Sequence, residues 1–228
     1  MPRIIFKNCD CIKYMNGMKD ESVDLVVTDP PYLMKYKTRC RKNKAHKFCH
    51  EILNDDNEDV IEEYIEQCYR VLKNNSAMYM FCNSNKVDVF KALIEKHGFK
   101  IKNIIIWVKN NHTAGDLQAQ FGKAYEMIIL ANKGRKKING KRFEDVWYFD
   151  RVSGNNLVHQ NQKPLDLICR CIKCHSDEND VVFDGFAGSA TTGIACIKLN
   201  RKFIGCELDD EYYKIAKERI RKVVEENG

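Results

Sequence analysis

Short apolar runs alternate along the chain with stretches in which apolar residues recur at helical spacing. The apolar runs are VDLVVT (23–28), AMYMFC (77–82), IIIWV (104–108), EMIIL (126–130), VVFD (181–184) and KFIGC (202–206). Runs that are apolar throughout are typical of strands covered on both faces. Between them, helical spacing joins Val60 to Leu72, Val87 to Ile94 and Tyr212 to Val223. The pattern predicts one α/β domain over residues 1–228, doubly wound on a mostly parallel sheet.

Two irregular segments, 33–57 and 131–158, interrupt this alternation and are longer than ordinary connections, which favours a functional role. They also carry the positive charge of the chain, whose net charge is +6. Seven Lys or Arg residues lie between Lys35 and Lys47, and six lie between Lys133 and Arg142, with no acid in either stretch. A solvated loop is the simpler interpretation of one such run. Two runs on an otherwise acidic chain favour a polyanion such as nucleic acid.

Composition limits where the protein acts and which cofactors it uses. No apolar run of the 228 residues approaches the roughly 18 that a membrane helix needs. The N-terminus lacks the layout of a secretory signal peptide, so we expect a cytoplasmic protein with no membrane partner. The 11 cysteines are therefore expected to be free thiols. Cys40, His46, Cys49 and His50 could ligate zinc, but their spacing matches no standard finger and we expect no metal site.

The stretch DVVFDGFAGSATTGIACIKLNRKFIGCELDDEYYKIAKERI (180–220) predicts a strand, a glycine turn, a helix, a second strand and a further helix. Ligands bind at the carboxyl ends of such strands, and Glu207 ends the second strand, where a carboxylate can accept ribose hydroxyls. A dinucleotide is the alternative, but the glycines do not have the spacing G-x-G-x-x-G. Asp184 would repel a pyrophosphate and attract an ammonium or sulfonium, which favours S-adenosylmethionine over NAD.

Several of these motifs, in this order, resemble one enzyme family. TDPPY (28–32), NQKP (161–164), FDGFAGSATTG (183–193) and FIGCELD (203–209) are similar to motifs of the β class of amino-group DNA methyltransferases. The resemblance covers nearly the whole chain. It implies a Rossmann-like class I methyltransferase fold in circularly permuted order, with the catalytic segment before the cofactor segment. The chain departs from the family at Gly185 and Ala190, where members commonly have Pro and Gly.

The resemblance also implies which residues act. The catalytic residues are Asp29, Pro30, Pro31 and Tyr32. The cofactor-binding residues are Asp10, Cys11, Asp29, Gln162, Lys163, Pro164, Asp184, Phe186, Ala187, Gly188, Ser189, Thr191 and Glu207. Of these, Asp10 and Cys11 would lie near the adenine ring, Glu207 at the ribose, and Asp184 with the 162–164 segment at the methionine end.

The chemistry of an exocyclic amine explains the TDPPY motif. Its lone pair is delocalised into the base, so the two hydrogens must be held and the lone pair directed at the methyl group. Asp29 can accept one hydrogen and the Pro30 carbonyl the other, Pro31 stiffens the turn, and Tyr32 can stack on a flipped base. In the family, Asp at the first position favours adenine N6. Cytosine N4, RNA, or a DNA-binding protein without turnover are the alternatives.

The basic segments predict where double-stranded DNA binds. We expect contacts from the 33–57 loop through Lys35, Lys37, Arg39, Arg41, Lys42 and Lys44. We expect others from a short target-recognition insertion at 131–158 through Arg135, Lys136, Lys137, Lys141 and Arg142. Phosphate contacts of this kind set affinity rather than specificity. A site-specific enzyme of DNA methylation or restriction–modification in a prokaryotic or phage setting is the predicted role, with a homodimer possible.

Overall fold

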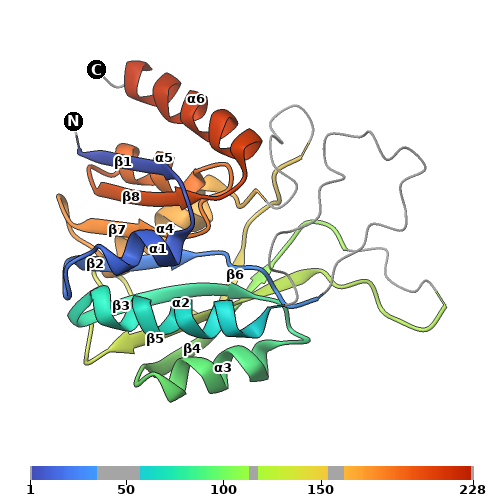
Figure 1. The fold of residues 1–228 in the computed structure, drawn as a ribbon. Helices are drawn as coiled ribbons and strands as arrows, with labels where there is room; N and C mark the ends of the chain where they lie inside the picture. The colour runs from blue at the N-terminus through green and yellow to red at the C-terminus, as the bar shows by residue number, and fades with distance from the viewer. Residues whose placement is uncertain (1, 35–56, 113–117, 154–161, 227–228) are drawn as a thin grey trace.

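A twisted sheet with helices on both faces forms the protein (Figure 1). The computed structural model describes residues 2–34, 57–112, 118–153 and 162–226. Its strands are β1 (Ile4–Asn8), β2 (Val23–Thr28), β3 (Leu72–Cys82), β4 (Lys100–Val108), β5 (Tyr125–Lys133), β6 (Val146–Tyr148), β7 (Val181–Asp184) and β8 (Lys202–Glu207). Its helices are α1 (Cys11–Asn16), α2 (Glu58–Val71), α3 (Val87–Lys96), α4 (Leu165–His175), α5 (Thr191–Lys198) and α6 (Asp210–Glu226).

The strand order is β1-β8-β7-β2-β3-β5-β4-β6. Only β5 runs antiparallel to its neighbours within the described residues, so the predicted mostly parallel, doubly wound fold is confirmed. The sequence pattern missed β1, β6 and α1. β6 has three residues inside a segment rich in Lys and Gly, and α1 has six, so neither offers a full period of apolar residues.

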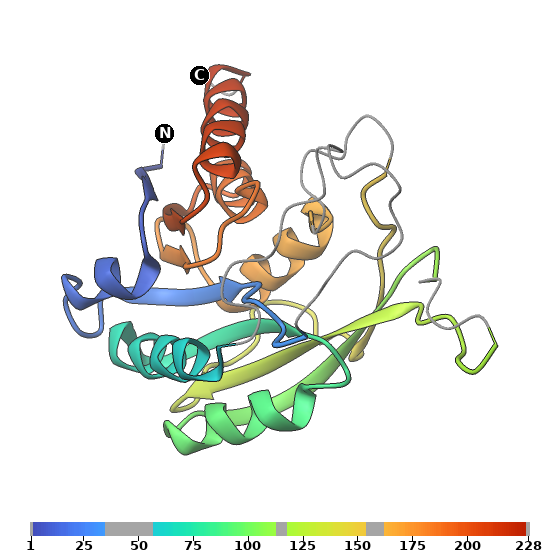
Figure 2. The ribbon, with the colours of Figure 1, turned by 45° about the vertical axis from the view of Figure 1, so that its right-hand side comes forward.

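The apolar strands are buried because each contributes alternate side chains to two cores. Val26 of β2 packs in the core under α1, α2 and α3, whereas Leu25 and Val27 pack in the core under α4 and α5. In β3, Met78 and Met80 face the first core, and Tyr79 faces the second. This alternation explains why the strands read as continuous apolar runs. Figure 2 shows the two helical layers on either side of the sheet.

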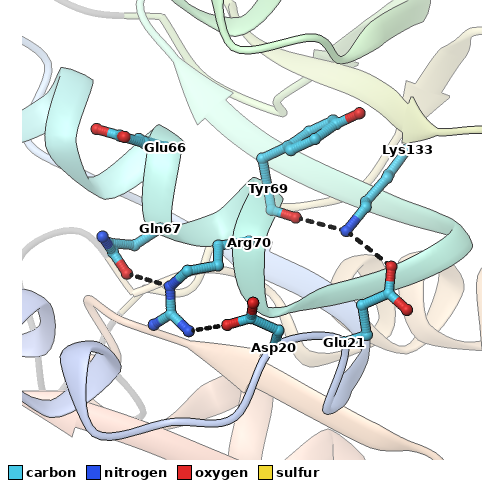
Figure 3. Close-up of a pocket in the computed structure, with 7 residues that line it drawn as sticks. All are labelled: Asp20, Glu21, Glu66, Gln67, Tyr69, Arg70 and Lys133. Atoms are coloured by element: carbon cyan, nitrogen blue, oxygen red, sulfur yellow. Dashed lines mark hydrogen bonds and ion pairs between the residues drawn. The ribbon is translucent and has the colours of Figure 1, made fainter.

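A polar hollow lies at the edge of the sheet where the parallel strands begin (Figure 3). Lys133 donates there to the carbonyl oxygens of Tyr69 at 2.9 Å and Leu72 at 2.7 Å, which satisfies the carboxyl end of α2. Arg70 donates to Asp20 at 2.5 Å and to Gln67 at 2.8 Å. Lys133 and Arg70 thus bind backbone carbonyls and side chains around the end of α2, so the residues of the hollow stabilise the junction between α2 and β3.

Within the described ranges, no helix combines the length and the apolar character needed to cross a lipid bilayer.

Candidate active site

The carboxyl ends of β2 and β7 lie side by side in the middle of the sheet. The two strands pair in parallel, with Leu25 opposite Val182 and Val26 opposite Phe183. The chain leaves β7 toward β8 on one side and leaves β2 in the direction of β3 on the other. This is a topological switch point, where the connections diverge and leave a crevice for ligands. It brings Asp29, which follows β2, and Asp184, which ends β7, to the same edge.

Asp29 is held by two donors. The Tyr32 hydroxyl donates to Oδ1 at 2.5 Å, and the Lys163 ammonium lies 2.7 Å from Oδ2. Burial raises the pKa of Asp29 above its ordinary value, while the Lys163 charge opposes that rise. With an ammonium and a hydroxyl both donating to it, we assign Asp29 as the carboxylate. The resemblance placed Lys163 among the cofactor residues, and the structure places it against Asp29, which the sequence predicts to be catalytic.

Glu126 and Lys109 complete a partly buried chain of charges that the sequence interpretation missed. Glu126 Oε2 lies 3.1 Å from the Lys163 ammonium, and Oε1 forms an ion pair with Lys109. Burial would raise the pKa of Glu126, but the two ammonium groups outweigh it and lower that pKa to about 2. The sequence contains a signal for both residues, because Glu126 is the acid that begins the apolar run EMIIL (126–130) and Lys109 directly follows the run IIIWV (104–108).

The TDPPY turn is packed against the protein on most sides. Pro30 and Pro31 are buried, and Tyr32 is half-buried. The Lys163 ammonium donates to the Tyr32 hydroxyl at 3.1 Å and lies 5.5 Å from the ring centroid, so this cation sits at the hydroxyl end of the ring.

The two predicted cofactor acids are fixed by loop donors. The Thr192 hydroxyl donates to Asp184 Oδ2 at 2.7 Å, and the backbone N–H of Phe186 donates to Oδ1 at 3.2 Å. Burial nevertheless raises the pKa of Asp184 to about 7. Glu207 accepts from the N–H of Gly188 at 2.8 Å, and its pKa is raised by burial and lowered in part by such N–H donors.

The glycine loop departs from the family pattern at two positions, and the structure gives a local cause for the first, Gly185. A Cβ at Gly185 would lie 2.4 Å from the Tyr64 ring, so Gly185 leaves the room that Tyr64 fills. The Gly185 N–H donates to the Tyr64 hydroxyl at 3.2 Å, a bond that proline could not form. Ala190 precedes α5 with φ 56°, in the left-handed region that favours glycine.

The other predicted cofactor residues lie at the same edge of the sheet. Asp10 caps α1 by accepting the Lys13 N–H at 3.0 Å, and the preceding Cys9 N–H donates to the Glu207 carbonyl at 3.1 Å. Cys11, the first residue of α1, is buried, and burial raises the pKa of its thiol. Ala187, Ser189 and Thr191 are buried in the loop, and Phe186 and Gly188 are half-buried. Gln162 and Pro164 flank Lys163.

The predicted DNA-binding residues divide into two groups. Lys35, Lys37, Arg39, Arg41, Lys42 and Lys44 lie outside the described residues. Arg135 donates its N–H to Asn75 at 2.9 Å, and the Lys136 carbonyl accepts from Asn132 at 3.2 Å. Because β5 runs antiparallel, it carries the chain away from Asp29 to the opposite edge of the sheet. Arg135, Lys136 and Lys137 follow β5 at that opposite edge. This location does not fit contact with DNA whose target base is held at Asp29.

Lys141 and Arg142 belong to the same basic stretch but lie on the surface beside α4. Lys141 lines a shallow groove with Phe143 and Arg170. The Arg170 guanidinium stacks 4.7 Å from the Phe143 ring and 4.5 Å from the Phe149 ring. In the described part of the chain, no group of three or more His, Cys, Asp or Glu residues is arranged to hold a metal ion.

The charges at this edge suit a cationic cofactor that carries a ribose. Asp29 and Glu207 each add to the rise in the Asp184 pKa, because three carboxylates share one edge of the sheet. A ligand with a sulfonium and an ammonium would offset this repulsion, and a pyrophosphate would increase it. Glu207 retains acceptor capacity for ribose hydroxyls, since each carboxylate oxygen accepts more than one hydrogen bond. These residues fit S-adenosylmethionine.

Known proteins similar to this chain share one chemistry. The family model N6_N4_Mtase, described as DNA methylase, matches residues 23–218. The type II methyltransferase M2.MboI of Moraxella bovis is 31% identical over 235 residues, covering 94% of this chain and 86% of its own length. The crystal structure of the M1.HpyAVI–SAM complex aligns with a TM-score of 0.72 at 28% identity, covering 95% of this chain and 99% of that one.

The cytosine-N4-specific PvuII DNA methyltransferase aligns with a TM-score of 0.78, covering 100% of this chain and 93% of that one. At 15% identity this likeness is one of fold alone. The fold therefore does not distinguish between amines of different bases. The matches extend over nearly the whole chain rather than over one motif.

Proposed function

The chain belongs to the N6/N4 family of DNA methylases, which are S-adenosylmethionine-dependent, and from this premise we propose that it methylates N6 of adenine at a specific site in double-stranded DNA. The family resemblance read from the sequence is thereby confirmed, as is S-adenosylmethionine as the cofactor. The choice of adenine rests on Asp29, because Asp at this position of the motif favours adenine N6 within the family.

The observation that carries the proposal is the pairing of β2 with β7, which sets Asp29 beside Asp184. One acid is thus available for the target amine and the other for a cationic methyl donor. When bound, S-adenosylmethionine supplies an electrophilic methyl group on a sulfonium. Asp184 would hold its positive end, and Glu207 its ribose hydroxyls.

The residues of the TDPPY turn would do the remaining work. Asp29 accepts one amine hydrogen and the Pro30 carbonyl the other, which directs the nitrogen lone pair toward the methyl group. The nitrogen–carbon bond forms as the sulfur–carbon bond breaks, and the nitrogen becomes positively charged. The Asp29 carboxylate stabilises this charge before the surplus proton leaves. Because the amine is enclosed in a duplex, the adenine must flip out to reach this edge.

DNA would approach the edge that holds Asp29. The part of the β4–β5 connection formed by residues 118–124 projects beyond this edge (Figures 1 and 2). It carries the fully exposed Phe121, and Lys123 whose ammonium lies 3.2 Å from Asn83. An exposed ring and a cation beside a flipped base are suited to stacking and to phosphate contact. A homodimer stays a prediction, which sedimentation equilibrium tests.

The test is nucleoside analysis of unmethylated DNA after incubation with the protein and S-adenosylmethionine. We expect N6-methyladenine, and less than about one hundredth of it with Asp29→Ala, because the amine loses its acceptor. The cofactor and DNA dissociation constants of the variant should stay close to those of the unmodified protein. N4-methylcytosine as the product would reject the adenine assignment. Methylation by Asp29→Ala at a near-normal rate would reject the role of the motif.

A further inference from the structure

Both oxygen atoms of Asp29 already accept hydrogen bonds. The Tyr32 hydroxyl takes Oδ1 at 2.5 Å, and the Lys163 ammonium takes Oδ2 at 2.7 Å. Each oxygen keeps further acceptor capacity, but an amine that approaches Asp29 has to compete with donors already 2.5 Å and 2.7 Å away. The Lys163 side chain is only 8% exposed, so its charge cannot move without another partner close at hand.

Glu126 is within reach of both donors. Its Oε2 lies 3.1 Å from the Lys163 ammonium and 3.3 Å from the Tyr32 hydroxyl. Its other oxygen is held by Lys109, and the Glu126 side chain is 19% exposed. The two groups that cover Asp29 thus already face one oxygen of a second, fixed carboxylate.

We propose that Glu126 is a positioning residue, which receives Lys163 and Tyr32 when the exocyclic amine of the target base replaces them at Asp29. The inference rests on the proposed function and deepens it, since it explains how Asp29 becomes available. No covalent bond changes in this step, because hydrogen bonds are only exchanged between two carboxylates.

The charges explain why a second carboxylate is needed. Lys109, Glu126, Lys163 and Asp29 alternate in sign along a chain of ion pairs. When Lys163 moves toward Glu126, its buried ammonium keeps a carboxylate partner, and Asp29 receives a hydrogen bond from the neutral amine in place of the ion pair. The exchange also turns the ammonium away from the amine nitrogen, on which positive charge develops during methyl transfer.

The variant that tests this is Glu126→Gln, which keeps the shape of the side chain and removes its charge. Lys163 then has Asp29 as its one carboxylate and stays there. We expect the single-turnover rate of methyl transfer to fall roughly 10- to 100-fold, as for other losses of positioning. The dissociation constant of S-adenosylmethionine, measured by calorimetry, should change less than about twofold, because the change in bonding lies on the amine side of the site.

A second variant separates positioning from simple charge balance. Glu126→Gln leaves Lys109 without its carboxylate, and the double variant Lys109→Met with Glu126→Gln removes that surplus charge. We expect the double variant to recover the urea midpoint of unfolding while its rate stays at least about tenfold low. Recovery of the full rate in the double variant would overturn the proposal, because charge balance alone would then explain the defect. So would a Glu126→Gln rate within about twofold of the unmodified one.

Glu62→Gln is the matched control. Glu62 makes the same kind of carboxylate–ammonium pair, with Lys96, on the solvent side of α2. We expect its rate to be unchanged, which shows that loss of a paired glutamate charge elsewhere is harmless. Failure of the unmodified protein to methylate any DNA, with cofactor still bound, would reject the proposed function. If the unmodified protein methylates DNA and Glu126→Gln does so at a similar rate, the role of Glu126 is rejected and the proposed function stands.

Discussion

Asp184→Asn is expected to stabilise the free protein at pH 8 and to abolish cofactor binding. Burial raises the pKa of Asp184 from 3.8 to about 7, so the folded protein holds this proton over a pH range in which the unfolded chain releases it. The contribution of Asp184 to stability is therefore full below pH 3.8 and is lost as pH rises through about 7. Asn carries no titrating proton and avoids this loss.

The size of the effect follows from the two pKa values. One pKa unit corresponds to about 1.4 kcal/mol, so the interval between 3.8 and about 7 corresponds to an upper value of about 4 kcal/mol. Asn keeps one acceptor for Thr192 or Phe186 but not both, which costs about 1 kcal/mol. We expect a net gain of about 2–3 kcal/mol in the free energy of unfolding at pH 8, which vanishes as pH falls and becomes a loss of about 1 kcal/mol near pH 4, where only the lost hydrogen bond remains.

Urea unfolding of the cofactor-free protein between pH 5 and 8 measures this, with Glu62→Gln as a carboxyl-to-amide control that should show no gain. Calorimetry should show that S-adenosylmethionine binds the unmodified protein more tightly as pH rises through about 7, where Asp184 ionises. An Asp184→Asn variant that is less stable than the unmodified protein at pH 8 would refute the reasoning. A cofactor affinity that is flat from pH 6 to 8 would refute it as well.

Two further substitutions test the glycine loop. Tyr64→Phe removes the hydroxyl that donates to Thr28 at 2.9 Å and accepts from Gly185, so calorimetry should show weaker cofactor binding and urea unfolding a loss of about 1–2 kcal/mol. Tyr79→Phe is the control, because it removes an equally buried hydroxyl, 2.6 Å from His175, and should lower stability without weakening cofactor binding. Equal effects of both variants on cofactor binding would contradict the role of Tyr64 in linking Thr28 to Gly185. Ala190→Gly should stabilise the protein by about 1 kcal/mol in urea unfolding, because φ at Ala190 is 56°. Ala195→Gly, inside α5, should destabilise it by about 1 kcal/mol, and a loss of stability at both positions would argue against strain at Ala190.

The pattern of apolar runs was sufficient for the centre of the sheet. Strands 23–28 and 181–184 have the bounds that the sequence predicts, because nearly all of their side chains are buried. Asp24, the one charged position inside them before the terminal Asp184, is half-buried and pairs with Lys73. Asp29 and Asp184 follow from these strands, since an acid after a buried strand lies at its carboxyl end.

Glu126 could not be found by the same rule. Glu126 is the second residue of β5, and because β5 is antiparallel its amino end lies at the edge where the parallel strands finish. A sequence pattern does not reveal strand direction, so the first residues of a strand are overlooked as site residues. The same reversal explains why Arg135, Lys136 and Lys137 lie opposite the site rather than beside it.

Packing partners far apart in the sequence account for the remaining gaps. Gly185 departs from the family motif because Tyr64, 121 residues earlier, fills the space that a Cβ would need and accepts the Gly185 N–H. Lys163 was assigned to the cofactor by resemblance, and its ion pair with Asp29 joins residues on different elements. Contacts of this kind join residues that are far apart in the chain, so no local sequence pattern predicts them.

The most direct test of the central claim is to incubate the protein with unmethylated genomic DNA and S-adenosylmethionine, and to read modified bases along single molecules. We predict N6-methyladenine at one short recurring sequence and none in DNA treated with Asp29→Ala. Modified cytosine, or no modified base in DNA treated with a protein that binds the cofactor, would contradict the assignment of Asp29 to adenine methylation.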